Sequence, residues 1–316
     1  MRLFLGVDGG QSSTMALIAD ESGRVIGSGR GGPCNHVKGP EGYTKFVNAI
    51  RGCLEAACAE AGLSPDGVHF EAACLGFSGG PADKQTIIES MIRTDRLIVT
   101  HDALIALVGA TAGQPGIITI AGTGSIAFGR NADDNTARAG GWGYIFGDEG
   151  GGFDLTRQAL RAALRFEEGW GQPTILREML LKEIGAESAN DLLHRFYTTD
   201  YPRPRIASYS RLVDEAATAG DRVALDILSY AAQQLAQLTG AVRQQLFEEG
   251  EEARVAYIGG VFQSQRLLQQ YRMLVELEDG NHVGPPEYEP AAGALLEAFR
   301  RAGVTVRLTN LPEREK

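Results

Sequence analysis

The segment Asp8–Thr14 holds the first residues whose types and spacing suit chemistry, and it directly follows the apolar run Leu3–Val7. Its glycines let the backbone approach a ligand closely, and its successive N–H groups and hydroxyls can surround phosphate oxygens. The segment has no lysine, so it is not a P-loop. Mg²⁺ would then compensate the phosphate charge, with Asp8 placed to hold the ion through water. An ordinary hairpin turn capped by Asp8 explains the same residues.

A second turn of the same kind, Gly122–Ser125, lies between the apolar stretches 117–120 and 126–128. It offers the same backbone and hydroxyl donors as the first turn. Taken alone, such a turn is more often structural. Together with Asp8–Thr14, it predicts a clamp that holds phosphate from two sides.

Asp102 stands after the predicted strand Leu97–Thr100 and before a predicted helix from Ala103. Reactive groups occupy this position in α/β folds, and a carboxylate here can accept the proton of a substrate hydroxyl that attacks a γ-phosphoryl group. The competing explanation is that Asp102 only caps the helix, which is the better one for this residue in isolation. We expect the neighbouring His101 to be a packed strand residue.

The densest group of glycines lies in residues 140–152, where seven of 13 residues are glycine. The entropy cost excludes a stable helix or strand, so we expect a loop that folds around a ligand. A sugar would suit, with Asp148 accepting hydrogen bonds from its hydroxyls and the backbone near Trp142 forming an apolar edge. Burial of Trp142 in the core is the alternative. Of the 41 glycines of the chain, 29 lie in residues 1–152, and we expect this excess to mark mainly ligand sites, with Gly23 and Gly27 as ordinary hairpin residues.

Alternating apolar and polar segments predict the elements that must position these residues. Strands and helices alternate up to residue 129, which is typical of an α/β layer structure. The opening hairpin recurs at 117–129 and hints at two related lobes. From residue 153 to about 247 we expect mainly helices. The predicted strands are Leu3–Val7, Met15–Ile18, Val25–Ile26, Ala73–Phe77, Leu97–Thr100, 117–120, 126–128 and Val255–Ile258; the predicted helices are Tyr43–Ala61, Lys84–Ile92, Ala103–Ala112, one from near Asp221, and Ala291–Phe299.

The composition limits the classes of binding partner that the protein can have. The formal net charge is −10, from 30 basic and 40 acidic residues, so no basic excess is available for nucleic acid or for an anionic membrane surface. The four cysteines all precede residue 75 and form no Cys-x-x-Cys pair, which fits a reducing cytoplasm better than a zinc site or disulfides. The N-terminal apolar run is too short for a signal peptide.

In order and spacing, these motifs resemble the BadF/BadG/BcrA/BcrD-type ATPases. Within that family the resemblance is strongest to N-acetylglucosamine kinases and the archaeal broad-specificity hexokinases, and it extends from residue 3 to about 300. No single loop is specific, but the ordered set is. The set comprises Asp8-Gly9-Gly10, Asp102, Gly122-Thr123-Gly124-Ser125, Gly141-Trp142-Gly143, Gly147-Asp148-Glu149-Gly150 and Gly259-Gly260-Val261.

The resemblance implies an α/β fold of the actin/hexokinase/heat-shock-chaperone type. Such a fold has two ribonuclease H-like lobes, with ATP and sugar in the cleft between them. The first lobe would span residues 1–112 and be completed by a C-terminal helix at about 291–306. The second would span residues 113–290 and carry helical insertions.

The resemblance also implies roles for single residues. Asp8 would hold Mg²⁺ through water, and Asp102 would be the base for the sugar hydroxyl. Gln11 replaces the third glycine usual in the first turn, and Gly151 stands where a serine commonly follows. The residues implied to contact ATP are Gly9, Gly10, Gln11, Ser12, Ser13, Thr14, Gly122, Thr123, Gly124, Ser125, Gly259 and Gly260. Besides Asp102, those implied to line the sugar are Asn35, His36, Ser78, Gly79, Gly141, Trp142, Gly143 and Asp148.

The implied function is transfer of the γ-phosphoryl group of ATP to the 6-hydroxyl of N-acetylglucosamine or a related amino hexose, by a cytoplasmic homodimer. A glucosamine kinase and a broad-specificity hexokinase are the nearest alternatives. An activator ATPase of a radical dehydratase would need cluster-binding cysteines in mid-chain, but none follows Cys74. A non-catalytic sugar sensor would open with a DNA-binding helical domain, whereas this chain opens on the strand at Leu3.

Overall fold

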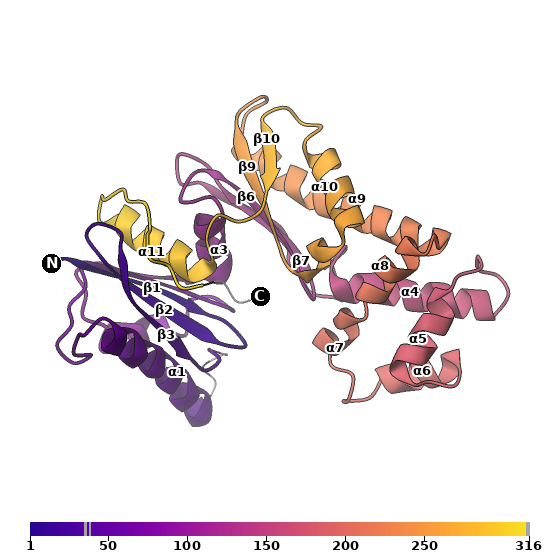
Figure 1. Ribbon diagram of the computed structural model, residues 1–316, viewed down its shortest axis with the longest axis horizontal. Coiled ribbons are helices and arrows are strands. Elements are labelled where there is room, and N and C mark those ends of the chain that lie inside the picture. Colours follow the sequence, from indigo (N-terminus) through magenta and orange to yellow (C-terminus); the bar gives the residue numbers. More distant parts are fainter. Residues whose placement is uncertain (35–36, 38, 314–316) are drawn as a thin grey trace. The chain divides into compact units, whose positions relative to one another are not determined.

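The computed structural model describes residues 1–34, 37 and 39–313 (Figure 1). Contacts divide the chain into two compact units. The first comprises Met1–Gln114 together with Pro286–Lys316, and the second comprises Pro115–Pro285. Each unit has its own five-stranded sheet.

The sheet of the first unit has the order β3-β2-β1-β4-β5. Strands β1 to β3 are antiparallel neighbours, while β4 and β5 run parallel to β1. The register pairs Gly9 with Phe77 and Phe77 with His101, so the residues that follow these three strands meet at one edge of the sheet. The strands are β1 Leu3–Gly9, β2 Thr14–Asp20, β3 Val25–Gly31, β4 Ala72–Phe77 and β5 Leu97–His101.

Helices cover both faces of this sheet. Because side chains alternate along a strand, Leu5 packs with α1 on one face and Phe4 with α11 on the other, where it stacks on Phe299 at 3.9 Å between ring centroids. The helices are α1 Gly39–Glu60, α2 Gln85–Met91, α3 Asp102–Ala110 and α11 Pro290–Arg301.

Strand β3 presents glycine at every second position to helix α1. A Cβ atom at Gly27, Gly29 or Gly31 would overlap a backbone carbonyl oxygen of α1. These glycines therefore permit close packing of helix on strand. The expectation that Gly27 is an ordinary hairpin residue is wrong.

The second unit repeats the strand order of the first. Its sheet reads β10-β9-β6-β7-β8, with β6 to β8 antiparallel and β9 and β10 parallel to β6. Renumbered from β6, this order matches that of the first sheet, and the two hairpins occupy equivalent places. The strands are β6 Gly116–Ala121, β7 Ser125–Arg130, β8 Thr136–Gly140, β9 Ala253–Ile258 and β10 Asn281–Gly284.

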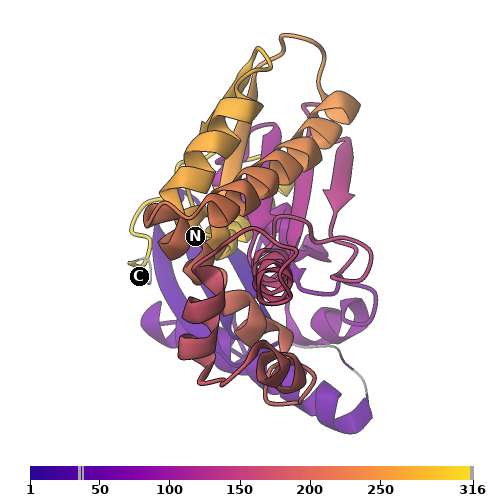
Figure 2. The same cartoon turned by 90° about the vertical axis from the view of Figure 1, so that its right-hand side faces the viewer.

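Long helices and a helical insertion complete the second unit. Helices α9 and α10 run side by side, joined by a 2.6 Å hydrogen bond from Gln270 to Ser229, and α9 packs on the sheet (Figures 1 and 2). The insertion supplies α4 to α8. The helices are α4 Gly152–Glu167, α5 Leu176–Ile184, α6 Ala189–Phe196, α7 Arg203–Ser208, α8 Arg211–Thr218, α9 Arg222–Leu246, the 3₁₀ turn η1 Gly260–Gln263 and α10 Gln265–Val275.

Two sheets of the ribonuclease H-like order confirm the predicted α/β fold of the actin-like ATPase type. The sequence patterns missed β8, β10 and α10. Strand β10 has only four residues and β8 has no fully buried residue, so neither carries a clear apolar pattern. No helix within the described residues combines the length and the apolar character needed to cross a membrane.

Candidate active site

The turn between β1 and β2 leaves its polar residues open to solvent. Gln11, Ser12 and Ser13 are exposed, and the Gly10 N–H donates to the Ser13 carbonyl at 3.0 Å. The neighbouring Thr14 is buried, and its hydroxyl donates to the Gly32 carbonyl at 2.7 Å. The Thr14 side chain therefore braces the turn, and the exposed serines with the turn backbone are its accessible donors.

Asp8, at the end of β1, lies in an acidic environment. Burial raises the pKa of Asp8 to about 6, with further upward contributions from the charges of Asp102 and Glu289. Asp8 and Glu289 also line one cavity of about 370 Å³ in the first unit. A divalent cation would reduce the electrostatic repulsion between these carboxylates.

The arrangement around Asp8 fits an ion held through water. Among the described residues, no three His, Cys, Asp or Glu side chains gather closely enough to hold a metal directly. Mg²⁺ commonly keeps several waters and takes only one or two carboxylates together with substrate phosphates. The residues present therefore fit the expected magnesium, with Asp8 as the side chain that would hold it.

Asp102 is fixed by two hydrogen bonds at the start of α3. Its Oδ2 accepts from the Ser78 hydroxyl at 2.7 Å, and its Oδ1 accepts from the Ala103 N–H at 2.9 Å. Ser78 follows β4 and Asp102 follows β5, so the parallel register brings together two residues that are 24 positions apart. The sequence placed both in the sugar site, but it gave no sign of the bond between them.

The helix cap falls on a different residue from the one expected. His101 is the N-cap of α3, and its Nδ1 accepts from the Leu104 N–H at 3.2 Å. To accept this hydrogen bond, the Nδ1 atom must carry no proton. The competing explanation of Asp102 as the cap is wrong. His101 is a strand residue, as expected, because it ends β5, and it also caps α3.

The turn between β6 and β7 is covered by the glycine-rich loop. The Ser125 hydroxyl donates to the Glu149 carbonyl at 2.6 Å, and the Gly152 N–H donates to the Gly122 carbonyl at 2.8 Å. A Cβ atom on Gly151 would lie 2.8 Å from the Gly124 Cα. In this chain the loop packs so tightly on the turn that a serine at 151 would require it to move.

Within the loop, Trp142 and Asp148 have opposite surroundings. Trp142 is 66% exposed, with the Arg138 guanidinium 4.8 Å from its ring, so the alternative of a core tryptophan is wrong. Asp148 is only 6% exposed and accepts from Arg203 Nη2 at 2.9 Å. The loop thus offers an exposed ring near an ion-paired, buried carboxylate.

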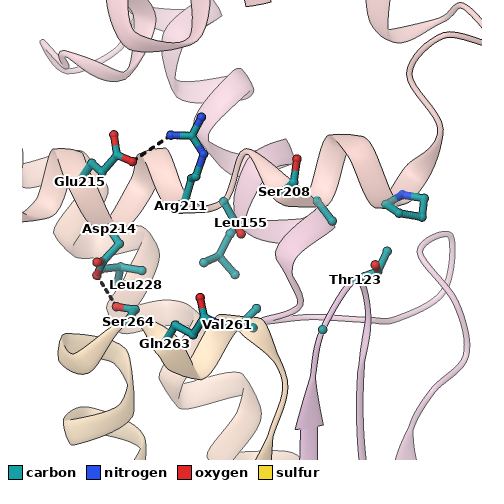
Figure 3. Close-up of a pocket in the computed structure, with 15 residues that line it drawn as sticks. Thr123, Leu155, Ser208, Arg211, Asp214, Glu215, Leu228, Val261, Gln263 and Ser264 are labelled. Carbon is teal, nitrogen blue, oxygen red and sulfur yellow. Dashed lines mark hydrogen bonds and ion pairs between the residues drawn. The ribbon is translucent and has the colours of Figure 1, made fainter. Parts of the chain in front are cut away.

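A cavity of about 590 Å³ opens beside the second turn (Figure 3). This volume lies within the range of small-molecule sites. Gly122 and Thr123 line it on one side and Gly260 on another, which brings two of the predicted nucleotide-binding segments together. Gly259, just before η1, has a φ of 114° that favours glycine.

Side chains of α8 and of Ser264, the N-cap of α10, contribute polar groups that the sequence motifs did not indicate. Figure 3 shows Arg211 paired with Glu215, and Asp214 hydrogen-bonded to the Ser264 hydroxyl. The Arg211–Glu215 distance is 2.9 Å. On a helix, charges at this spacing resemble an ordinary solvated face, so the sequence carried no signal for them.

A sequence model of the BadF/BadG/BcrA/BcrD ATPase family matches residues 5–298, nearly the whole chain. The chain belongs to the BadF/BadG/BcrA/BcrD ATPase family. A Clostridium acetobutylicum protein named N-acetylmuramic acid/N-acetylglucosamine kinase is 35% identical to it over 88% of this chain and 91% of that protein. A Dictyostelium discoideum protein named N-acetyl-D-glucosamine kinase is 27% identical, covering 94% of this chain and 98% of that protein.

A solved structure from Chromobacterium violaceum shares the architecture. Its protein is provisionally named an N-acetylglucosamine kinase, is 29% identical, and superposes with a TM-score of 0.72 over 94% of this chain and 98% of that chain. Both the family and the fold expected from the motifs are therefore confirmed.

In this member of the BadF/BadG/BcrA/BcrD ATPase family, the candidate residues fall into two groups. Asp8 to Thr14, Ser78, Gly79 and Asp102 belong to the first unit. Gly122 to Ser125, Gly141 to Gly143, Asp148 and Gly259-Gly260 belong to the second. Asn35 and His36, also predicted to contact the sugar, lie outside the described residues.

Proposed function

We propose that this protein is an ATP-dependent kinase that transfers the γ-phosphoryl group to the 6-hydroxyl of N-acetylglucosamine or a related amino hexose. The observation that carries the proposal is the placement of Asp102: it starts a helix at the end of a parallel strand, with its carboxylate held by Ser78. Relatives named as hexosamine kinases along nearly the full length of the chain support this reading.

In the proposed reaction Asp102 takes the proton of the attacking sugar hydroxyl. The Ser78 hydroxyl keeps the carboxylate turned in one direction, which reduces the reorganisation needed at that moment. The backbone N–H groups of each glycine turn can donate hydrogen bonds to phosphate oxygens. Magnesium held near Asp8 would supply positive charge to the phosphate oxygens.

The proposed nucleotide pocket is the 590 Å³ cavity of the second unit. Gly260 and Val261 form part of its wall, and the polar groups of Arg211, Asp214 and Ser264 surround it. An adenosine has both an apolar ring face and hydroxyls, which matches a lining of this mixed character.

N-acetylmuramic acid is a second candidate acceptor. The Clostridium acetobutylicum protein, at 35% identity, carries that sugar in its name. The two candidates share the 2-acetamido group and the 6-hydroxyl, so the chemistry assigned to Asp102 is unchanged between them.

The test is ADP release from ATP and Mg²⁺ against a panel of acceptors. We expect turnover with N-acetylglucosamine above that with glucosamine, glucose and N-acetylmannosamine. Turnover with N-acetylmuramic acid tests the second candidate acceptor. N-acetylglucosamine lacking the 6-hydroxyl is the matched control and should give none. No stimulation of ADP release by any of these sugars would overturn the kinase proposal, and turnover with the 6-deoxy sugar would overturn the 6-hydroxyl assignment.

The cysteines support a reducing compartment and weaken the activator-ATPase alternative. Cys34, Cys53, Cys58 and Cys74 are all free and buried. None is placed to ligate a cluster from the surface, and burial raises the pKa of the Cys53 thiol to about 12. We propose a cytoplasmic location and a homodimer, which light scattering of the purified protein would test.

A further inference from the structure

Helix α7 connects the glycine-rich loop to the proposed nucleotide cavity. At its start, Arg203 Nη2 donates to Asp148 Oδ2 at 2.9 Å. The same guanidinium lies 4.6 Å from the ring of Tyr144 and 5.7 Å from the ring of Phe153. Arg203 therefore contacts the loop through the Asp148 ion pair and the Tyr144 ring, and it also contacts Phe153 in the first turn of α4.

The same short helix also forms part of the cavity wall. Pro204, Ala207 and Ser208 line the 590 Å³ cavity, and Figure 3 shows Ser208 of this helix and Thr123 of the second turn among the residues around it. A ligand in the cavity would thus contact residues one to five positions after Arg203. Binding of that ligand can therefore shift α7, the helix whose Arg203 holds Asp148.

Close packing leaves little freedom between these parts. A Cβ atom on Gly152 would lie 3.0 Å from the Ala207 carbonyl oxygen and 3.1 Å from the Gly122 carbonyl oxygen. A Cβ atom on Gly124 would lie 2.5 Å from the Asp148 carboxyl carbon. The glycine-rich loop, the turn between β6 and β7, and α7 are in direct contact. Because they are closely packed, a displacement of one of them requires the others to move.

Arg203 is also the counter-charge that Asp148 needs. The Asp148 carboxylate is buried, and a buried charge that loses its partner is strongly destabilised. Without Arg203, the Asp148 carboxylate would lack its counter-charge and would move toward solvent, which changes its position against Gly124.

We propose that Arg203 is a positioning residue that couples the nucleotide cavity to the sugar loop: it fixes Asp148 for the sugar while α7 carries the effect of nucleotide binding. The proposal rests on the proposed kinase function and on the sugar role of Asp148. Coupling of this kind is reciprocal, so each substrate tightens the binding of the other by the same factor.

Calorimetric titration tests the coupling directly. The dissociation constant of N-acetylglucosamine, or of the acceptor identified by the panel, is measured with and without a non-hydrolysable ATP analogue and Mg²⁺. For the wild-type protein we expect the analogue to tighten sugar binding by at least about fivefold. In Arg203→Gln we expect sugar binding about tenfold weaker and a coupling factor near one, with analogue affinity in the absence of sugar little changed.

Arg205→Gln is the matched control. Arg205 lies on the same helix, stacks on Tyr201 at 4.2 Å and donates to the Asp200 carbonyl at 2.8 Å, so it has the same residue type and a similar ring contact away from the loop. It should keep wild-type coupling. Arg203→Lys keeps the charge and should restore part of the sugar affinity, with the change in KM rather than in kcat.

The outcomes separate the two proposals. Wild-type coupling in Arg203→Gln, or no coupling in the wild-type protein while sugar binds, overturns the role of Arg203 and leaves the kinase proposal standing. Failure of every sugar in the panel to bind or react overturns both. Unfolding of Arg203→Gln is detected by circular dichroism, and Arg203→Met, which removes the charge but keeps much of the side-chain volume, then decides: unchanged sugar KM and coupling in that variant overturn the proposal.

Discussion

The turn between β1 and β2 and the turn between β6 and β7 join equivalent strands of two sheets with the same order. The first is open: Ser12 and Ser13 are exposed, and the carboxylates of Asp8 and Asp102 lie in the same unit. The second is covered by residues 147–153 and opens beside a 590 Å³ cavity. Under the proposed function, this comparison assigns acid–base chemistry to the first unit and ligand enclosure to the second.

The sharpest test of this division is Asp102→Asn. Loss of the base should lower kcat by about 10²- to 10⁴-fold. Nucleotide affinity should be nearly unchanged, because the proposed cavity is lined wholly by the second unit. Steady-state ADP release and titration with an ATP analogue measure the two effects. Wild-type turnover in this variant would remove Asp102 from the chemistry.

The contrast in packing predicts different responses of the two turns to an added methyl group. At Gly124, a Cβ would meet the buried Asp148 carboxylate, whereas at Gly10 its nearest neighbour is the Ser13 carbonyl oxygen at 3.1 Å. We expect Gly124→Ala to lower the free energy of unfolding by about 1–3 kcal/mol and Gly10→Ala to lower it by less. Urea denaturation without ligands measures both. Equal losses would show that the two turns are packed alike.

The smallest expected effect concerns Asp8 and pH. Because the pKa of Asp8 is raised to about 6, the native state holds this proton more tightly than the unfolded chain does. The stability contributed by protonated Asp8 is therefore lost as pH rises from about 4 through 6. Asp8→Asn should stabilise the ligand-free protein by about 1 kcal/mol at pH 7.5, and the gain should shrink toward pH 4.5.

Urea denaturation at the two pH values checks this prediction. Ser12→Ala, a substitution of an exposed residue in the same turn, is the control. Its free energy of unfolding should differ from that of the wild-type protein by the same small amount at both pH values. If the gain in the free energy of unfolding from Asp8→Asn does not depend on pH, the ionised Asp8 carboxylate does not destabilise the native protein.

Much of the fold could be predicted because local patterns carry it. The opening hairpin and the strand before Asp102 have short apolar runs next to polar turn residues, and the long helix from near Asp221 has an apolar period of 3.6 and a cap. Strand β10, with four residues, has too few positions to show a period. Its pairing with β9 depends on the rest of the sheet.

The candidate site was only half predictable for a similar reason. Asp8, Asp102 and the two turns stand in motifs of characteristic order. Arg203 stands in none, because its partner Asp148 is 55 positions away and only the folded chain brings them together. The side chains that surround the cavity, such as Arg211, are likewise assigned by packing and not by spacing.

The sequence by itself determined the family, the alternation of elements and the order of the glycine turns, since these depend on residue types at short separations. Only the tertiary structure decided how individual residues are used. It made His101 the cap of α3, exposed Trp142, buried Asp148 against Gly124, and used Gly27, Gly29 and Gly31 to seat a helix. These outcomes depend on contacts between distant segments, and their free energies arise only when the sheets and helices pack.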